Sequence, residues 1–338
     1  MMHLDKKQPT SVARVISEFK EAYWVKDLDG EYLAKVTGKQ MFEASSREDY
    51  PAVGDWVTIT KPDDDHAVIN AILPRSTVIK RKYGDKVQII AANIDIAFVV
   101  ESVNRDYNLN RFERYFAIAE NGGVRPTIIL NKVDLIPKQE LAEKLFQLKN
   151  RFPGIETIFT STVNNEGINE LKKHIVRDKT YCFLGSSGVG KSSIINKLIG
   201  DNAIKTANIS SYSNRGKHVT AHRQMYFLEN GGIVVDNPGM REVGMAGSGQ
   251  GIDTFFHEIT ALAQKCKYTD CTHTHEPGCE VMSAVKSGKL EKDKYGNYIT
   301  LKKEAKYYEL DDIGKKEKDR KFGKFLKKAK KVLKDLEV

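Results

Sequence analysis

The order of two short motifs constrains the fold of this chain more than any other feature of its sequence. Residues 131–134 have the sequence N-K-V-D, which fits the N-K-x-D pattern that contacts a guanine base. Residues 185–192 have the sequence G-S-S-G-V-G-K-S, which fits the phosphate-binding pattern G-x-x-x-x-G-K-[ST]. The usual order places the phosphate loop before N-K-x-D. The reversed order therefore predicts an α/β fold in which a P-loop GTPase domain is circularly permuted.

The surroundings of the second motif favour a phosphate-binding loop over a glycine-rich turn without a ligand. An apolar run over 181–184 predicts a strand before the loop, and apolar spacing over 193–199 predicts a helix after it. Glycines let backbone N–H groups approach phosphate oxygens, and the helix N-terminus adds partial positive charge. Lys191 is expected to reach the β- and γ-phosphates, and Ser192 to coordinate Mg²⁺. The residues expected to contact the nucleotide here are Gly185, Ser186, Ser187, Gly188, Val189, Gly190, Lys191, Ser192 and Ser193.

The N-K-x-D segment is expected to select guanine over adenine. It follows an apolar run over 127–130 that predicts a buried strand. The Asp134 carboxylate has the two oxygens needed to accept hydrogen bonds from guanine N1–H and the 2-amino group, whereas adenine offers neither donor. Asn131 and Lys132 would hold the loop and cover the base. Because an unpaired buried polar group is costly, ATP should be rejected. A turn that merely closes the strand is the alternative.

Two further segments complete the expected nucleotide site. An apolar strand ends in D-N-P-G, where Asp236 would hold the Mg²⁺ shell and the Gly239 N–H would face the γ-phosphate. Ser161 and Thr162 follow a helical stretch and correspond to the last guanine-contacting loop. That loop usually has Ser-Ala, so Thr162 is a departure. Contacts of this kind are made largely by the backbone, so both residues are still expected to bind GTP.

The segment between the phosphate loop and the D-N-P-G strand is expected to supply groups for hydrolysis. Thr220 is the expected second Mg²⁺ ligand, with Thr206 as the alternative. Many GTPases orient water with a glutamine after D-x-x-G, but this chain has Met240, which predicts slow basal hydrolysis. His218 is the internal candidate for positioning that water, and a solvated histidine or an RNA phosphate contact is the alternative. The expected catalytic residues are thus Lys191, Thr220 and His218.

Three of the four cysteines of the chain fall within fourteen residues and indicate a metal site. Cys266, Cys271 and Cys279, with one histidine, would give a tetrahedral Cys₃His set, which suits structural zinc. The histidine is His273 or His275. Four protein ligands leave no position for water, so no catalysis is expected there. A disulfide with spare thiols is the alternative, which an intracellular chain disfavours.

The N-terminal region predicts short strands separated by turns, which fit an OB-fold β-barrel of the kind that commonly binds RNA. These strands are expected over 11–16, 22–26, 31–36, 53–59 and 66–73. The basic segment 80–86 is expected to be a linker. The expected domains are an OB-fold RNA-binding domain over 1–79, a permuted GTPase domain over 80–245, and an α-helical zinc-binding domain with a basic C-terminal helix over 246–338.

The charge of the chain favours a polyanionic partner. The net charge is +9, and residues 315–334 hold eleven lysines and arginines against two acidic residues. Apolar spacing over 322–333 predicts an amphipathic helix whose lysines face RNA phosphates, with a solvated face or a membrane surface as alternatives. The polar N-terminus and the lack of an apolar run near twenty residues predict a cytoplasmic protein without membrane contact. Without a heptad run, a monomer is expected.

Together these motifs resemble the ribosome small subunit-dependent GTPases, the RsgA/YjeQ family, over nearly the whole chain. The resemblance rests on motif order, on R-G-K-H-V-T over 215–220, on D-x-P-G and on the Cys-x₄-Cys-x-His-x₅-Cys spacing. It implies the three domains given above, with His273 as the fourth zinc ligand. The family is usually threonine-rich where this chain has Val219 and Ala221, so only Thr220 can serve there.

The resemblance implies GTP hydrolysis in late maturation of the small (30S) ribosomal subunit, stimulated by that subunit. GTP with Mg²⁺, one structural zinc and ribosomal RNA are the implied ligands. Two alternatives stay open: an RNA-binding placeholder or chaperone in which nucleotide only sets affinity, and a GTPase that acts on membranes through its basic tail. Subunit-stimulated turnover, GTP-dependent binding without turnover, and liposome binding would distinguish the three.

Overall fold

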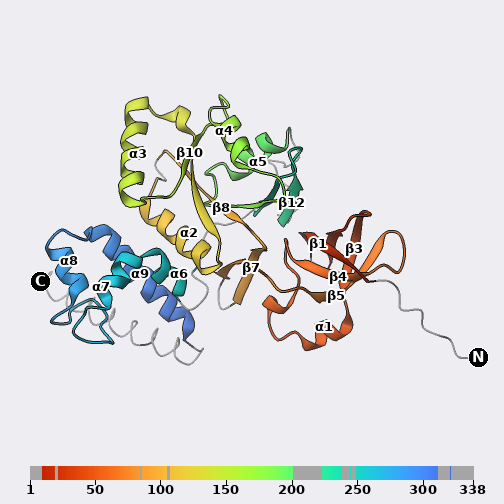
Figure 1. Ribbon diagram of the computed structural model, residues 1–338, viewed down its shortest axis with the longest axis horizontal. Coiled ribbons are helices and arrows are strands. Elements are labelled where there is room, and N and C mark those ends of the chain that lie inside the picture. The colour runs from red at the N-terminus through yellow and green to blue at the C-terminus, as the bar shows by residue number, and fades with distance from the viewer. Residues whose placement is uncertain are drawn as a thin grey trace, which may run out of the picture. The chain divides into compact units, whose positions relative to one another are not determined.

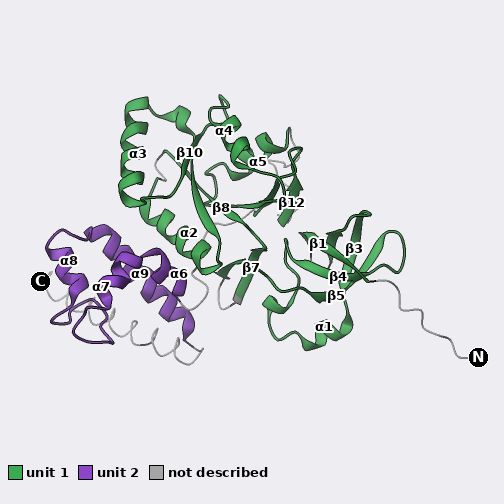
Figure 2. Cartoon of the chain, in the orientation of Figure 1, with its two compact units in different colours: residues 1–244 green, residues 245–338 purple. Residues whose placement is uncertain are grey.

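The chain forms two compact units, Met1–Gly244 and Met245–Val338 (Figure 2). The computed structural model describes residues 10–19, 22–83, 86–104, 107–200, 223–237, 244, 249–310 and 320. Within that part of the chain, every strand belongs to the first unit, and the second unit is helical. The first unit therefore has to supply both the expected barrel and the expected nucleotide-binding sheet.

The N-terminal strands form a closed five-stranded barrel, which confirms the expected β-barrel. The strands follow the order β1-β2-β3-β5-β4, and a further pairing of β1 with β4 closes the ring (Figure 1). Alternate residues such as Val15, Val25 and Ile69 fill the interior. The strands are β1 (Thr10–Glu18), β2 (Tyr23–Lys26), β3 (Glu31–Val36), β4 (Trp56–Thr60) and β5 (His66–Ile72), with helix α1 (Gly38–Glu43) and a short 3₁₀ turn, Arg47–Asp49, between β3 and β4.

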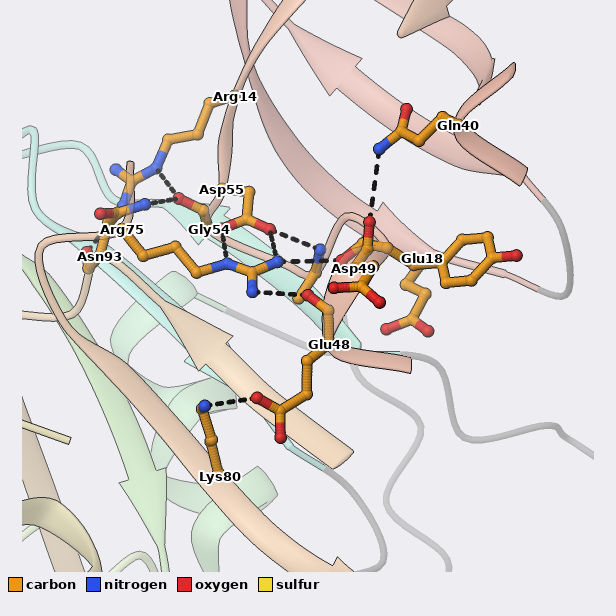
Figure 3. Close-up of polar contacts among 12 residues, drawn as sticks. Arg14, Glu18, Gln40, Glu48, Asp49, Gly54, Asp55, Arg75, Lys80 and Asn93 are labelled. Atoms are coloured by element: carbon orange, nitrogen blue, oxygen red, sulfur yellow. Dashed lines mark hydrogen bonds and ion pairs between the residues drawn. The ribbon is translucent and has the colours of Figure 1, made fainter. Parts of the chain in front are cut away.

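A buried ion pair fixes the loop that leads into β4. The Asp55 carboxylate is fully buried, and Arg75 donates to its two oxygens at 2.8 Å and 2.7 Å. The same guanidinium donates to the backbone carbonyls of Glu48 and Tyr50, both at 2.9 Å (Figure 3). Asp55 also accepts from the Ala52 N–H at 2.8 Å. Among the described residues, the hydrogen bonds to the Asp55 carboxylate come from Arg75 and from the backbone of Ala52.

Replacing Arg75 with alanine is expected to lower the free energy of unfolding of the barrel by about 3–5 kcal/mol, because it removes the ion-pair partner of the buried Asp55 carboxylate. Both tryptophans of the chain, Trp24 and Trp56, lie on barrel strands, so their fluorescence during urea unfolding reports the change. The matched control is Arg47→Ala, since Arg47 is exposed and lies 3.9 Å from its acidic partner; we expect a loss below about 1 kcal/mol. Equal losses for the two variants would contradict this prediction.

Six further strands form the nucleotide-binding sheet. Its order is β10-β9-β8-β11-β13-β12, parallel except for β12. Aromatic and branched side chains such as Phe98, Phe183 and Ile194 form its core. The strands are β8 (Ile96–Ser102), β9 (Arg125–Asn131), β10 (Thr157–Thr160), β11 (Thr180–Leu184), β12 (Arg223–Phe227) and β13 (Ile233–Asp236). The helices are α2 (Leu109–Asn121), α3 (Lys138–Arg151), α4 (Ile168–His174) and α5 (Lys191–Ile199), with a 3₁₀ turn over Val133–Leu135.

The expected linker over 80–86 is instead part of a hairpin, so that prediction was wrong. Strands β6 (Val78–Tyr83) and β7 (Lys86–Ala92) pair in antiparallel register. The basic side chains are accommodated by specific partners: Arg81 donates to its cross-strand neighbour Gln88 at 3.0 Å, and Lys80 pairs with Glu48 at 2.5 Å (Figure 3). Basic residues are compatible with a strand when their charges meet acceptors, here Gln88 across the ladder and Glu48 outside the hairpin.

The barrel and the nucleotide-binding sheet share one hydrogen-bonded ladder. Strand β1 pairs with β2 and β4 in the barrel, and it also pairs with β12. This last pairing joins the five barrel strands and the six strands of the nucleotide-binding sheet into one eleven-stranded sheet. Ser17 Oγ donates to the Arg223 carbonyl at 3.1 Å, and Arg14 donates to Thr180 Oγ1 at 2.9 Å. Gly54 is needed at this junction, because a Cβ there would lie 2.1 Å from the Ala92 carbonyl oxygen. The barrel therefore pairs with β12, and Arg14 also ties it to the first residue of β11, the strand that precedes the phosphate loop.

The second unit packs short helices around a small apolar core. The buried side chains include Phe256, Ile259, Val281, Tyr298 and Leu301. The helices are α6 (Gln250–Phe255), α7 (His257–Ala263), α8 (Glu280–Lys286) and α9 (Lys292–Glu309). The amphipathic helix expected over 322–333 lies outside the described residues. None of the helices in the described part of the chain is long and apolar enough to cross a bilayer.

Candidate nucleotide site and metal cluster

The two nucleotide-binding motifs meet at the carboxyl edge of the parallel strands. Strands β8, β9, β10, β11 and β13 all end there, which is where open α/β sheets bind ligands. Gly190, at the start of α5, has φ of 103°, and a Cβ on it would lie 2.2 Å from Asn131 Nδ2. The glycine of the phosphate loop is thus required for contact with N-K-x-D. The circular permutation changes the order of the motifs along the chain and leaves their contact intact.

Asn131 and Lys132 hold the phosphate loop directly. Asn131 Nδ2 donates to the Val189 carbonyl at 2.8 Å, and its Oδ1 accepts from Thr160 Oγ1 at 3.0 Å. Lys132 Nζ donates to the Gly188 carbonyl at 2.6 Å, and its backbone adopts the left-handed conformation, with φ of 64°. The loop, the N-K-x-D turn and the end of β10 therefore form one hydrogen-bonded assembly.

Asp134 is exposed and already oriented by a neighbour. Ser161 Oγ donates a short hydrogen bond to Asp134 Oδ1, and the buried Ser161 in turn accepts from the Val163 N–H at 3.2 Å. Thr162 is half-buried beside it. The carboxylate is held at the surface, where its remaining acceptor positions face solvent. An arrangement of this kind can receive the adjacent N–H donors of a guanine base.

Lys191 lies buried beneath the phosphate loop. Its Nζ donates to the Gly185 and Ser186 carbonyls at 2.6 Å and 2.7 Å. Burial lowers its pKa to about 8, against the opposing attraction of Asp236 and Glu101. Such a partly desolvated cation gains strongly from an anion placed beside it. The loop therefore offers backbone donors and one buried positive charge to a phosphate.

The end of β13 fits a hard cation. Asp236 is 4% exposed, and its buried Oδ1 has no hydrogen-bond partner among the residues that the structure describes. Burial raises the pKa of Asp236 to about 6, while Lys191 acts to lower it. Carboxylate and hydroxyl oxygens are the donors that Mg²⁺ prefers, and Ser192 stands in the first turn of α5. An orphaned carboxylate oxygen beside the phosphate loop is consistent with a magnesium ion that arrives with its nucleotide.

Several predicted site residues are not among those that the structure describes. Thr220, its alternative Thr206, His218, Gly239 and Met240 all lie outside the described residues. The loop residues 185–193, Asn131, Lys132, Asp134, Ser161, Thr162 and Asp236 are described, and they lie along one edge of the sheet.

Sequence reasoning missed three polar groups that support this site. Thr160 orients Asn131, Asn237 donates to Cys182 Sγ at 3.0 Å behind the loop, and the buried Glu101 acts electrostatically on Lys191. Thr160 could have been found from the sequence, because it is a polar residue at the end of an apolar run and directly precedes the predicted site residue Ser161. Glu101 sits in an otherwise apolar strand, and a charged residue in such a run marks a position that calls for a partner.

The second unit brings together the four expected metal ligands. Ligand atoms of Cys266, Cys271, His273 and Cys279 all lie within 4.8 Å of one another. The two sulfurs of Cys266 and Cys279 are 3.9 Å apart, and His273 Nδ1 lies 3.6 Å from each. Tetrahedral zinc, with Zn–S of about 2.3 Å and Zn–N of about 2.0 Å, needs an S···S separation of about 3.8 Å and an S···N separation of about 3.5 Å. The cluster can therefore hold a metal ion, and the histidine within it is His273 rather than the exposed His275.

Comparison with known proteins decides the family. A family model described as RsgA GTPase matches residues 72–246, a little over half of the chain. A protein of Lactiplantibacillus plantarum named small ribosomal subunit biogenesis GTPase RsgA 2 is 40% identical over 310 residues, which cover 91% of this chain and 87% of that protein. The chain belongs to the RsgA GTPase family. A second RsgA relative, from Bacteroides thetaiotaomicron, is 34% identical over 95% of this chain and 90% of its own length.

Solved structures of the same kind share the fold. The crystal structure of YjeQ from Thermotoga maritima gives a TM-score of 0.65 at 25% identity and covers 88% of this chain and 99% of that chain. YloQ, described as a circularly permuted GTPase, gives a TM-score of 0.63 at 23% identity and covers 92% of this chain and 100% of its own. The predicted circular permutation is confirmed. As a member of the RsgA GTPase family, the chain is a GTP hydrolase.

Proposed function

We propose that this chain hydrolyses GTP during late maturation of the small (30S) ribosomal subunit, and that the subunit stimulates the reaction. Its RsgA relatives carry the name small ribosomal subunit biogenesis GTPase, which supports this partner. The observation that carries the enzymatic part is the contact of Asn131 and Lys132 with the phosphate loop, since it places base recognition and phosphate binding in one site.

The roles of the site residues follow from this geometry. Asn131, Lys132, Asp134, Ser161 and Thr162 bind guanine, and the loop 185–193 cradles the phosphates with its backbone N–H groups. Asp236, Ser192 and Thr220 would hold the magnesium ion, which would neutralise phosphate charge when bound. Gly239 contacts the γ-phosphate. The positive charge of Lys191 stabilises the negative charge that develops on the phosphate oxygens during hydrolysis.

The attacking water needs a partner that the D-x-x-G loop does not supply. Met240 has no hydrogen-bonding group suited to orienting water, so basal turnover is slow. His218 positions the water in the complex with the ribosomal subunit. The chain alone thus binds the nucleotide, and the subunit stimulates hydrolysis by helping to position the attacking water.

The other domains place the enzyme on RNA. The barrel, residues 1–79, and the basic C-terminal segment bind ribosomal RNA through phosphate contacts, which suits the net charge of +9. The Cys₃His cluster holds one zinc ion as a structural element of the domain over 246–338. The protein works as a monomer in the cytoplasm, where its ribosomal partner is assembled.

The test is steady-state hydrolysis of GTP and ATP with and without purified small subunits. We expect slow GTP turnover that rises at least tenfold with subunits, and no ATP turnover, because Asp134 rejects adenine. His218→Ala should lose the stimulated rate while GTP binding is retained. GTP-dependent binding to subunits without added turnover would contradict the stimulated enzyme, and so would liposome binding without stimulation.

A further inference from the structure

The Glu276 carboxylate accepts several hydrogen bonds from the loop that contains the metal-binding histidine, His273. Glu276 Oε1 accepts from the Thr272 N–H at 2.9 Å, and Glu276 Oε2 accepts from the Thr274 and His275 N–H groups at 3.0 Å and 3.1 Å. The Thr272 hydroxyl also donates to Oε1. Backbone donors on both sides of His273 therefore converge on a single side chain.

The residue at the centre of this loop has an uncommon backbone. His273 has φ of 61°, in the left-handed region that residues with a Cβ seldom occupy. Its carbonyl accepts from the Tyr295 hydroxyl of α9 at 2.7 Å, which fixes the other side of the same residue. This conformation directs Nδ1 between Cys266 and Cys279, at 3.6 Å from each sulfur.

We propose that Glu276 is the positioning residue of the metal cluster: its carboxylate holds the 272–275 loop so that His273 meets the three cysteines in a ready tetrahedral arrangement. The inference rests on the proposal that the cluster holds zinc. Glu276 is not among the four ligating groups, and it acts through the backbone of the loop. Residues that orient metal ligands in this way typically change metal affinity by about 10–100-fold when they are replaced.

The test is metal affinity of the full chain, measured by competition with a chelator for zinc and by titration with cobalt. We expect Glu276→Ala to bind both ions about 10–100-fold more weakly than the unaltered chain. The cobalt spectrum at saturation should keep its tetrahedral bands and thiolate charge transfer, because the four ligands are unchanged. Glu276→Gln keeps one carbonyl oxygen for the loop and should fall between the two.

Asp270→Asn is the matched control. Asp270 is exposed and directly precedes Cys271 in the sequence. Its replacement therefore removes one negative charge beside the site, as Glu276→Ala does, but leaves the hydrogen bonds of the 272–275 loop in place. It should bind metal within about twofold of the unaltered chain. Affinity of Glu276→Ala and Glu276→Gln within twofold of the unaltered chain would overturn the positioning role. Absence of zinc and cobalt binding by the unaltered chain itself would instead overturn the cluster as a metal site.

Discussion

Replacing Lys191 with methionine is expected to lower kcat/KM for GTP by about 10³-fold. A single preorganised donor to developing charge is typically worth about 10²–10³ in rate, and Lys191 supplies a full positive charge from a buried position. Methionine keeps the apolar stem, so the change isolates the ammonium group. The measurement is single-turnover hydrolysis of GTP alongside equilibrium binding of GTP and GDP.

Lys197→Met is the control for this variant. Lys197 lies on the same helix, α5, near its other end, and is exposed. We expect its kcat/KM to stay within about twofold of that of the unaltered chain, since the charge is screened by solvent. Retention of more than a tenth of the activity in Lys191→Met would show that the loop backbone alone binds the phosphates.

The pH dependence of nucleotide binding gives an independent view of the same lysine. Burial lowers the pKa of Lys191 to about 8 in the nucleotide-free chain. Phosphate charge favours the protonated form and raises this pKa, so binding takes up a proton above pH 8. Affinity for GTP should therefore weaken as the pH rises beyond about 8. The Lys191→Met variant should lack this decline, and an identical decline in both proteins would assign it to another group.

The motifs could be read from the sequence because each is a local pattern tied to one geometry. The phosphate loop needs glycine at Gly185 and Gly190, whose φ values are 145° and 103°, and its lysine follows at a fixed place. The metal cluster is equally local, since Cys266, Cys271 and Cys279 lie in one short segment. In both cases neighbours in sequence are neighbours in space, and the residue spacing carries the information.

The joining of the barrel to the nucleotide-binding sheet could not be predicted in the same way. Ser17 and Arg223, which hydrogen-bond across β1 and β12, are 206 positions apart. Arg14 and Thr180 are 166 positions apart. Strand pairing at such separation leaves no periodic pattern, because each strand is specified only by its own alternation. The hairpin β6–β7 was missed for a different reason: its basic residues suggested a linker. Their acceptors, Gln88 across the hairpin and Glu48 outside it, were not apparent from spacing.

Asn in place of Asp134 is expected to weaken GTP binding by about 100-fold and to transfer the preference to xanthosine triphosphate. Each charge-assisted hydrogen bond lost is worth about 1.5–3 kcal/mol, and 1.4 kcal/mol is a factor of ten in affinity. In this chain Ser161 Oγ donates to Asp134 Oδ1, so the oxygen of an asparagine would be kept toward Ser161 and its NH₂ turned toward the base. That NH₂ would oppose the 2-amino group of guanine.

The xanthine base carries a carbonyl where guanine carries the 2-amino group, and it therefore accepts from the new NH₂ donor. Calorimetric titration of both nucleotides into Asp134→Asn measures the change in preference. Asp178→Asn is the control, since the Asp178 side chain is 87% exposed and lies 3.7 Å from the similarly exposed side chain of its neighbour Arg177. Ser161→Ala in the Asp134→Asn background should reduce the preference for xanthine, because nothing then fixes the orientation of the amide. Equal loss of both nucleotides in Asp134→Asn would mean that the residue supports the loop and does not read the base. Recovery with xanthosine triphosphate, by contrast, requires direct contact between this side chain and the C2 substituent.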